Sequence, residues 1–547
     1  MTIGSRLPFI SKMLYEFDSV DFAVATFRFS IEQVTPHFPG YILHVLFAKL
    51  LLVIIYDINF AFVWISILLS VGSVLLLWRA GAALRAERVG LIAAVIWVFL
   101  PILWFYGEIA TAYVYEAFFA TAFLFLGSKL FRNPEKKIYA YLLFISLSLA
   151  MGARQSSIIF FAPCLVYTLV KTRQPIKTWI AGASLFLLST IVWSVVLFNL
   201  SGGISQYFAQ AGKETVYRSQ SILFGNSLRG QLSVIAKVAI YLFMAVLPIL
   251  TVVGSMGFAQ TRRSFDFAKA QLSKPIARFV ILVAFPSLLF YLVIYFMKAG
   301  YLLNVLPSIV LIGAIFLDQM AIWRAERIKR ASHDTLKLTR PLITNNAIRS
   351  TAFVVALELI LFLTPFPWLD DINFDNGFTR DSLNMQESIV DAKFGGGADL
   401  FLNRLFSFNN VHGVRAIDAL HSSVEAALKS SGVSEDSLVL LDTWWHRWGY
   451  FYLPQAFIYD IRDFPGSDSL WLGASENHVR TGIADTLVVI PRNKTVLLLL
   501  REDHPTFASL VQQVHLKRLD LPQYLDIYRI TDEHFSFKWK NVRFIKE

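Results

Sequence analysis

The sequence is poor in cysteine and in charge. Its single cysteine among 547 residues, Cys164, lies inside an apolar run, which excludes both a disulfide framework and a thiolate metal site. Charged residues make up only 16% of the chain, whereas hydrophobic residues reach 56% and aromatic residues 15%. This composition is far more apolar than that of a soluble domain. The sequence therefore predicts a polytopic α-helical membrane protein.

Two further features are missing. Met1 to Leu14 hold no apolar core long enough for a signal peptide or a span, so targeting must rest on later segments. There is no compact His, Cys and Asp signature such as HExxH, and we expect no obligatory metal and no cofactor. The net charge of +11 does not indicate nucleic acid, because the basic residues form short clusters between apolar segments, where they report topology and contact anionic lipid.

Roughly ten apolar segments are predicted to be spans, although several are shorter than the length of about 20 residues that a bilayer requires. They cover residues 60–78, 89–105, 110–130, 138–153, 157–170, 179–200, 234–258, 279–297, 301–317 and 351–366. The dense basic clusters between them all fall on one side, which is predicted to be cytoplasmic. The acidic start of the chain and the C-terminal part are then extracytoplasmic, and in a bacterium the membrane would be the inner (plasma) membrane. The apolar run 41–56, which supplies only about four-fifths of that length, is predicted to lie on the outer surface.

The composition changes abruptly after Pro365. We expect an outer segment with surface-lying helices over 1–59, a membrane domain over 60–366 and a small extracytoplasmic α/β domain over 367–547. Expected strands cover 437–441, 457–461, 486–490, 495–500, 525–530 and 537–545, and expected helices cover 416–429 and 506–514. Between them, the stretch from Asp442 to Tyr450 is an aromatic-rich turn that could stack on a sugar or lipid, although packing against the membrane domain is favoured.

Three carboxylates, Glu16, Asp18 and Asp21, crowd into six residues ahead of the membrane domain. On a helix, Asp18 and Asp21 share one face. The group is either a catalytic cluster at the mouth of a membrane cavity or a solvated acidic helix beside the membrane.

Other polar residues are predicted to lie on the same outer side, where ionisable groups near a membrane are candidates for function. They are Glu108, Glu116, Arg154, Arg218 and Lys298. Glu116 and Arg154 could instead form a purely structural buried ion pair, and Lys298 could be a loop lysine near head groups.

This set of groups suits the transfer of a sugar from a lipid phosphate. The leaving phosphate needs its charge held by Arg or Lys, and the acceptor hydroxyl must lose a proton to a carboxylate within hydrogen-bond reach. Asp18 is the predicted base, with Glu16 or Asp21 orienting it or binding the acceptor. His37, Glu108 and Glu116 are assigned to shaping the site or binding the acceptor.

Glu16-Phe17-Asp18 and Pro36-His37-Phe38-Pro39-Gly40-Tyr41 resemble the acidic motif and the Pro-Gly-Tyr entry to a surface helix in the GT-C superfamily of polyprenyl-phosphate-sugar glycosyltransferases. That superfamily includes protein mannosyltransferases and the aminoarabinose transferase of lipid A. The resemblance implies that Asp18 is the base, that the anomeric carbon is inverted, and that Arg154, Lys298 and Tyr301 lie near the donor phosphate. Arg218, on the predicted outer side, is a further candidate for binding this phosphate. The family pattern has a span before the acidic loop, and here only about fifteen residues precede it, too few to cross.

The expected partners are therefore the membrane, a polyprenyl-phosphate sugar and a lipid, glycan or protein acceptor, with no nucleic acid. Two other classes stay open. A transporter or flippase for a lipid-linked or anionic substrate would also carry paired charges near the membrane, although no inverted repeat is evident. A non-catalytic anchor that presents the C-terminal domain would make the outer polar residues dispensable.

Overall fold

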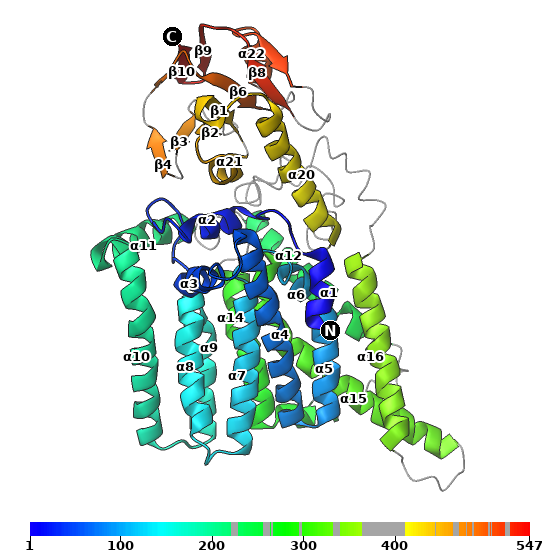
Figure 1. The fold of residues 1–547 in the computed structure, drawn as a ribbon. Coiled ribbons are helices and arrows are strands. Elements are labelled where there is room, and N and C mark those ends of the chain that lie inside the picture. Colours follow the sequence, from blue (N-terminus) through cyan, green and yellow to red (C-terminus); the bar gives the residue numbers. More distant parts are fainter. Residues whose placement is uncertain are drawn as a thin grey trace. The chain divides into compact units, whose positions relative to one another are not determined.

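A computed structural model describes residues 1–547 except 220–227, 255–262, 264–265, 268, 295–297, 332–339, 364–410, 444, 463–469, 477–478, 484–485, 501–503, 505 and 520–525. The described chain forms two compact units (Figure 1). The first contains Met1–Ser11 and the chain from Phe38 to the end of the long helices, and the second contains Lys12–His37 and the chain from Arg415 onward. The units thus do not follow chain order. The predicted boundary at 366 lies outside the described residues.

The first unit is a bundle of long apolar helices. Its main helices are α4 (Ile58–Leu84), α5 (Glu87–Phe99), α6 (Pro101–Tyr106), α7 (Val114–Arg132), α8 (Ile138–Ala153), α9 (Ser157–Lys171), α10 (Ile176–Leu200), α12 (Leu228–Gly254), α14 (Pro275–Val293), α15 (Leu306–Ala331) and α16 (Arg340–Leu363). Short elements α1 (Thr2–Arg6), η1 (Leu7–Phe9), α3 (Ile42–Leu51), α11 (Ile204–Ser219) and η2 (Ala299–Asn304) join or flank them. Each predicted span overlaps at least one of these helices, and the predicted helical architecture with several apolar spans is confirmed.

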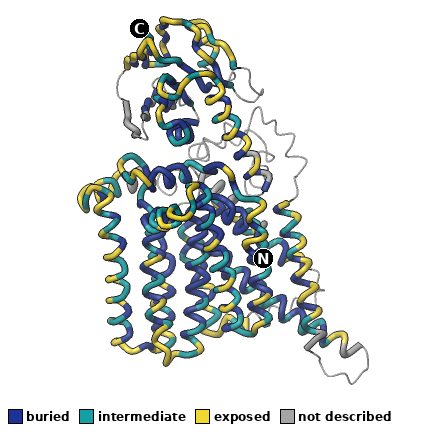
Figure 2. Tube along the Cα trace, viewed as in Figure 1, coloured by how far each residue is buried: buried dark blue, intermediate teal, exposed yellow. Residues whose placement is uncertain are grey.

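Six helices in the described part of the chain are long and apolar enough to cross a membrane, namely α4, α7, α10, α14, α15 and α16. They differ in how far they are covered by protein: 78% of the apolar window of α7 is buried, against 17% for α10. Figure 2 shows this contrast along the two helices. A helix whose apolar side chains are left uncovered needs lipid around it. These helices make the chain an integral membrane protein.

The predicted span over residues 89–105 is wrong in one respect, because it consists of two helices, α5 and α6. Leu100 adopts an extended ψ of 119° immediately before Pro101. A proline disfavours helical geometry in the residue before it and is well suited to the first position of a new helix. The break ends α5 and starts α6, which leads the chain to Glu108.

The short apolar run after Tyr41 forms α3, whose ten residues cannot cross a bilayer. In Figure 1, α3 lies at the end of α8 and packs beside α4. Its surface position in the membrane stays a prediction.

The second unit contains two β-sheets. The larger has seven strands in the order β4-β3-β2-β1-β6-β8-β7, and the smaller has three in the order β5-β10-β9. The bounds are β1 (Leu438–Asp442), β2 (Phe457–Arg462), β3 (Trp471–Glu476), β4 (Val479–Ile483), β5 (Leu487–Ile490), β6 (Thr495–Leu499), β7 (Leu516–Arg518), β8 (Ile527–Ile530), β9 (Phe535–Trp539) and β10 (Val542–Lys546). Helices α20 (Val411–Ser430), η5 (Glu435–Ser437), α21 (His446–Tyr452) and α22 (Phe507–Val511) complete the fold. The expected mixed α/β domain is confirmed.

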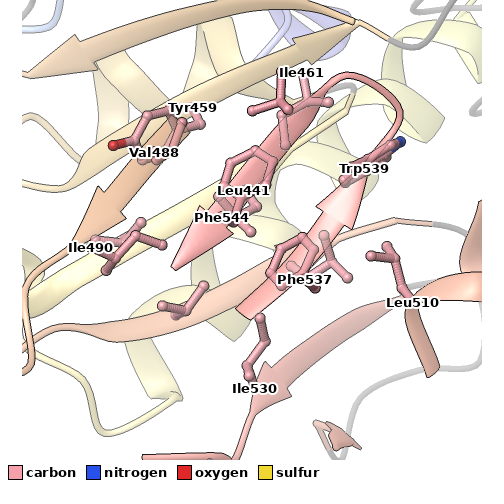
Figure 3. Packing of buried hydrophobic residues seen from close by; sticks show 14 of the residues in the cluster. Leu441, Tyr459, Ile461, Val488, Ile490, Leu510, Ile530, Phe537, Trp539 and Phe544 are labelled. Atoms are coloured by element: carbon pink, nitrogen blue, oxygen red, sulfur yellow. The ribbon is translucent and has the colours of Figure 1, made fainter. Parts of the chain in front are cut away.

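Strand β1 is the centre of the larger sheet, because it pairs in parallel with β2 on one side and β6 on the other. Its alternating side chains face opposite sides. Leu441 belongs to the apolar core that both sheets share with Phe537 and Phe544 of the smaller sheet (Figure 3). The order of the strands changes at β1, because β2, β3 and β4 are added on one side of it and β6 on the other. The carboxyl end of β1 therefore lies at a topological switch point. Helix α21 begins there.

The single strand predicted for 537–545 is wrong and is a hairpin of β9 and β10. Lys540 adopts a positive φ of 52°, which turns the chain between Trp539 and Val542. The sequences Asn-Gly and Asp-Gly are the usual indication of a two-residue hairpin turn. Lys540-Asn541 carries no such signal.

Candidate active site

The acidic residues lie on a short helix of the second unit, α2 (Phe17–Ala25). Glu16 and Ser19 form a capping box that starts it: the Ser19 hydroxyl accepts a hydrogen bond from the Glu16 N–H at 3.2 Å, and the Glu16 side chain accepts one from the backbone of Ser19. Glu16 therefore has a structural task. Its part in chemistry stays a prediction.

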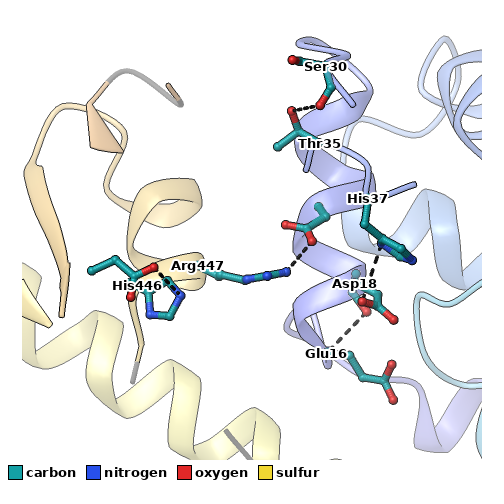
Figure 4. Close-up of polar contacts among 10 residues, drawn as sticks. Glu16, Asp18, Ser30, Thr35, His37, His446 and Arg447 are labelled. Atoms are coloured by element: carbon teal, nitrogen blue, oxygen red, sulfur yellow. Dashed lines mark hydrogen bonds and ion pairs between the residues drawn. The ribbon is translucent and has the colours of Figure 1, made fainter. Parts of the chain in front are cut away.

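Asp18, Asp21 and His37 come together, and Figure 4 shows Asp18 beside His37. His37 Nδ1 lies 3.7 Å from Asp18 Oδ1, and the side chains of His37 and Asp18 are 15% and 14% exposed. Backbone hydrogen bonds between Ser30 and Thr35 close the loop that returns the chain from α2 to His37. The expectation that Asp18 and Asp21 share a face is confirmed, and His37 joins them.

These three side chains offer ligand atoms within 4.8 Å of one another, a composition that a divalent cation can accept. Asp21, however, is fully buried and its Oδ2 forms an ion pair with Arg447. A cation would compete with this guanidinium for Asp21. The negative charge of Asp21 is thus already compensated by the guanidinium of Arg447.

Arg447 was missed as a site residue by reasoning from sequence, which assigned its stretch to packing. It lies on α21 and reaches across to α2 (Figure 4). Its guanidinium lies 4.9 Å from the ring centre of Phe17. Burial lowers the pKa of Arg447, but the charges of Asp21 and Asp18 outweigh it and raise the pKa above its ordinary value. Arg447 is thus a permanent cation that faces both carboxylates.

Three side chains of the C-terminal part bind the backbone just ahead of α2. Asp418 of α20 accepts hydrogen bonds from the N–H groups of Lys12 and Met13 at 2.8 and 3.0 Å. The Tyr452 hydroxyl accepts from the Leu14 N–H at 3.0 Å, and Trp448 Nε1 donates to the Leu14 carbonyl at 2.6 Å. The acidic segment is therefore built into the C-terminal domain.

His421 of α20 packs against α21 and the residue just before that helix. Its Nδ1 accepts a hydrogen bond from Trp445 Nε1 at 3.0 Å, and its ring stacks on Trp448 with 4.0 Å between ring centres. Burial lowers the pKa of His421 to about 3. The ring is neutral at physiological pH.

We predict that this histidine makes the second unit sensitive to acid. An unfolded histidine titrates near ~6.5, so between that pH and about 3 the unfolded chain binds one more proton than the folded one. The contribution of His421 to the free energy of unfolding is complete above the pKa of the unfolded histidine. Below that pKa, the free energy of unfolding falls by about 1.4 kcal/mol per pH unit. Hydrogen exchange of α20 peptides in the full-length protein, measured in urea at pH 7.0 and 5.0, should show this loss.

His421→Gln, whose amide oxygen can still accept from Trp445, should remove most of the pH dependence. The exposed His534 provides the control, and His534→Gln should keep it. An unchanged slope in His421→Gln would contradict the assignment.

A second polar cluster lies inside the first unit, around Glu116 on α7. Arg154 forms an ion pair with Glu116, Tyr291 donates a hydrogen bond to Glu116 Oε2 at 3.1 Å, and Asn304 Nδ2 donates to the same oxygen at 2.6 Å. Glu116 is 1% exposed. The pairing considered from the sequence is therefore present, and Tyr291 and Asn304 are partners that their apolar surroundings concealed.

The predicted donor-binding residues Lys298 and Tyr301 belong to the same cluster. The Arg154 guanidinium lies 4.4 Å from the ring centre of Tyr301, and Lys298 Nζ lies 5.8 Å from that of Tyr113. Gly300 permits this packing, because a Cβ there would come within 2.6 Å of the Tyr113 ring. Two cations thus flank one group of tyrosines.

Two predicted residues lie elsewhere. Glu108 is fully buried in the first unit, where its charge acts on the equally buried Arg6. The Arg6 guanidinium lies 5.0 Å from the Trp104 ring. Arg218 falls within α11, and its side chain lies outside the described residues. Arg6 was not singled out from the sequence, because one arginine near a chain start gives no signal.

No family model and no curated protein matches the chain. Solved structures do. ArnT from Cupriavidus metallidurans in the apo state matches with a TM-score of 0.54 at 9% identity, over 96% of this chain and 96% of its own. The fold is similar to that of ArnT. ArnT bound to undecaprenyl phosphate matches with a TM-score of 0.55 at 10% identity, over 97% of each chain.

These two matches show a similar fold over nearly the whole chain. The archaeal oligosaccharyltransferase AglB from Archaeoglobus fulgidus also matches, with a TM-score of 0.37 at 13% identity over 71% of this chain and 58% of its own. A score that low adds nothing to the argument.

Proposed function

We propose that this protein is a membrane glycosyltransferase that moves a sugar from a polyprenyl-phosphate donor to an acceptor hydroxyl on the extracytoplasmic side. One observation carries the proposal: an ArnT-like fold over nearly the whole chain has, in its acidic segment, the cluster of Asp18, Asp21 and His37. ArnT itself has been solved with undecaprenyl phosphate bound. A polyprenyl phosphate is accordingly the expected carrier.

Asp18 is the carboxylate best suited to act as general base. Asp21 is fully buried against Arg447, and Glu16 caps α2, whereas the Asp18 side chain is partly exposed and has His37 beside it. In the proposed step, the acceptor oxygen forms a bond to the anomeric carbon while its proton passes to Asp18. The bond from that carbon to the phosphate oxygen breaks, its electron pair leaves with the lipid phosphate, and the configuration inverts.

The charge that accumulates on the leaving phosphate requires cations. Arg154 and Lys298 are the proposed partners, with Tyr301 as a hydroxyl donor and Arg218 as a further candidate. The Glu116 pair holds one end of Arg154, and Tyr301 covers its face. Such fixed cations stabilise developing charge without reorganising during the reaction.

The direct test is sugar transfer by the purified full-length protein in lipid nanodiscs. Radiolabelled polyprenyl-phosphate sugars would be supplied with lipid, glycan and peptide acceptors, and transferred label measured. Transfer that Asp18→Asn abolishes would support the proposal. Failure of the wild-type protein with every donor, together with movement of labelled lipid between leaflets, would favour a flippase instead.

Lys298→Ala should weaken donor binding more than it slows the chemical step. A charge-assisted hydrogen bond contributes about 1.5–3 kcal/mol, so the donor KM should rise about ten- to a hundredfold with kcat changed much less. Lys136, an exposed lysine in the loop before α8, provides the control variant Lys136→Ala. A donor KM equal to that of the control would remove Lys298 from the phosphate site.

A further inference from the structure

Arg447, a side chain of the C-terminal domain, forms an ion pair with Asp21 of the acidic helix. It lies on α21, which starts at the carboxyl end of β1 and packs on β2. Gly449 makes this close approach possible, because a Cβ there would lie 2.9 Å from Ile458. The sheet thereby fixes the backbone from which Arg447 extends.

The switch point of an open α/β sheet is where such sheets usually bind ligands. Here residues 12–21 of the same chain are bound next to it. Phe17 packs on Trp448 and stacks on His446, with ring centres 4.9 and 6.1 Å apart, and His446 lies 3.2 Å from Asp460 of β2. Aromatic packing, backbone hydrogen bonds and the ion pair all hold the same short helix.

Among the contacts between α21 and α2, the ion pair of Arg447 with Asp21 is the one that fixes the orientation of α2. Asp21 is fully buried, and a buried carboxylate without a partner is costly. Arg447 compensates the charge of Asp21. Its guanidinium also lies over the ring face of Phe17, which helps to hold the guanidinium in place. Asp18 lies on the same helix face as Asp21, three residues before it. The rotation of α2 about its axis therefore sets the direction in which the Asp18 carboxylate points.

We propose that Arg447 is a positioning residue for the transfer reaction, which holds α2 through Asp21 and Phe17 so that the Asp18 carboxylate faces the acceptor hydroxyl. The inference rests on the proposed function and assigns the C-terminal domain a task in it. In this role Arg447 contacts no substrate. Its contribution is orientation, which is worth up to about a hundredfold in rate for a displacement of about 1 Å.

The test compares Arg447→Gln and Arg447→Lys with the exposed control Arg529→Gln in the same domain. Arg447→Gln should lower kcat about ten- to a hundredfold while the donor KM stays within about twofold. Arg447→Lys keeps the charge but not the planar guanidinium, so it should recover part of the loss. All rates are normalised to the monodisperse protein, because a merely structural role would reduce the folded amount and not its kcat.

Hydrogen exchange provides a readout that needs no activity. Peptides covering α2 should exchange faster in Arg447→Gln than in Arg529→Gln, and Asp21→Asn/Arg447→Gln should restore stability without restoring kcat. Wild-type kcat in Arg447→Gln would overturn the inference and leave the proposed function intact. If the wild-type protein transfers no sugar, the proposed function fails, and unchanged exchange in α2 would then refute the placement by Arg447 as well.

Discussion

Replacing Asp18 by Asn should lower the rate constant of sugar transfer by about 10²- to 10⁴-fold, the usual contribution of a general base. The amide preserves the shape of the side chain but cannot accept the acceptor's proton. His37 stays beside the substituted group, and Arg447 stays paired with Asp21. The measurement is single-turnover transfer of labelled sugar at saturating donor, so that weakened binding does not imitate a slower chemical step.

Two variants frame this result. Asp436→Asn removes an exposed carboxylate of the same unit and should transfer at the wild-type rate. His37→Asn should reduce transfer less than Asp18→Asn does, because His37 is expected to shape the site. A larger loss in His37→Asn, or wild-type transfer in Asp18→Asn, would remove Asp18 as the base.

Replacing Arg154 by Ala should lower the free energy of unfolding of the helical unit by about 3–5 kcal/mol, because it leaves a buried carboxylate without its cation. Tyr291 and Asn304 remain as partners of Glu116, but neither carries a charge. The loss should appear as a shift in unfolding by SDS in mixed micelles. Arg132→Ala, at the exposed end of α7, is the matched control.

The double variant Glu116→Gln/Arg154→Met separates charge from packing. The double variant leaves no uncompensated buried charge, because the Glu116 carboxylate has been replaced by a neutral amide. It should therefore recover most of the stability lost in Arg154→Ala. It should not recover sugar transfer if Arg154 holds the donor phosphate. Equal unfolding of Arg154→Ala and Arg132→Ala would show that the pair contributes little to the native fold.

The sequence was informative wherever the cause of structure is local. Long apolar runs predicted the helices, and the spacing of three residues between Asp18 and Asp21 placed both carboxylates on one face. The pairing of Glu116 with Arg154 was also within reach, because both are rare charges in apolar surroundings and are separated by 38 residues.

The partner of Asp21 was out of reach for a physical reason. Arg447 lies 426 residues further along the chain, and no periodicity or spacing connects positions so far apart. The aromatic stretch around it was noticed, but an aromatic cluster does not indicate what it packs against. Tyr291 and Asn304 were hidden in the same way, since a single hydroxyl or amide near an apolar span reports no partner.

The union of residues 12–37 with the C-terminal domain has a consequence for biosynthesis. The helix bearing Asp18 and the backbone just ahead of it leave the ribosome well before their partners Asp418, Trp448 and Arg447. The three contacts join residues that are 406, 434 and 426 positions apart in the sequence. Contacts of such long sequence separation form late in folding. Nascent chains would therefore complete their membrane helices before the acidic helix acquires its partners, so that incomplete chains in the membrane would lack an assembled site.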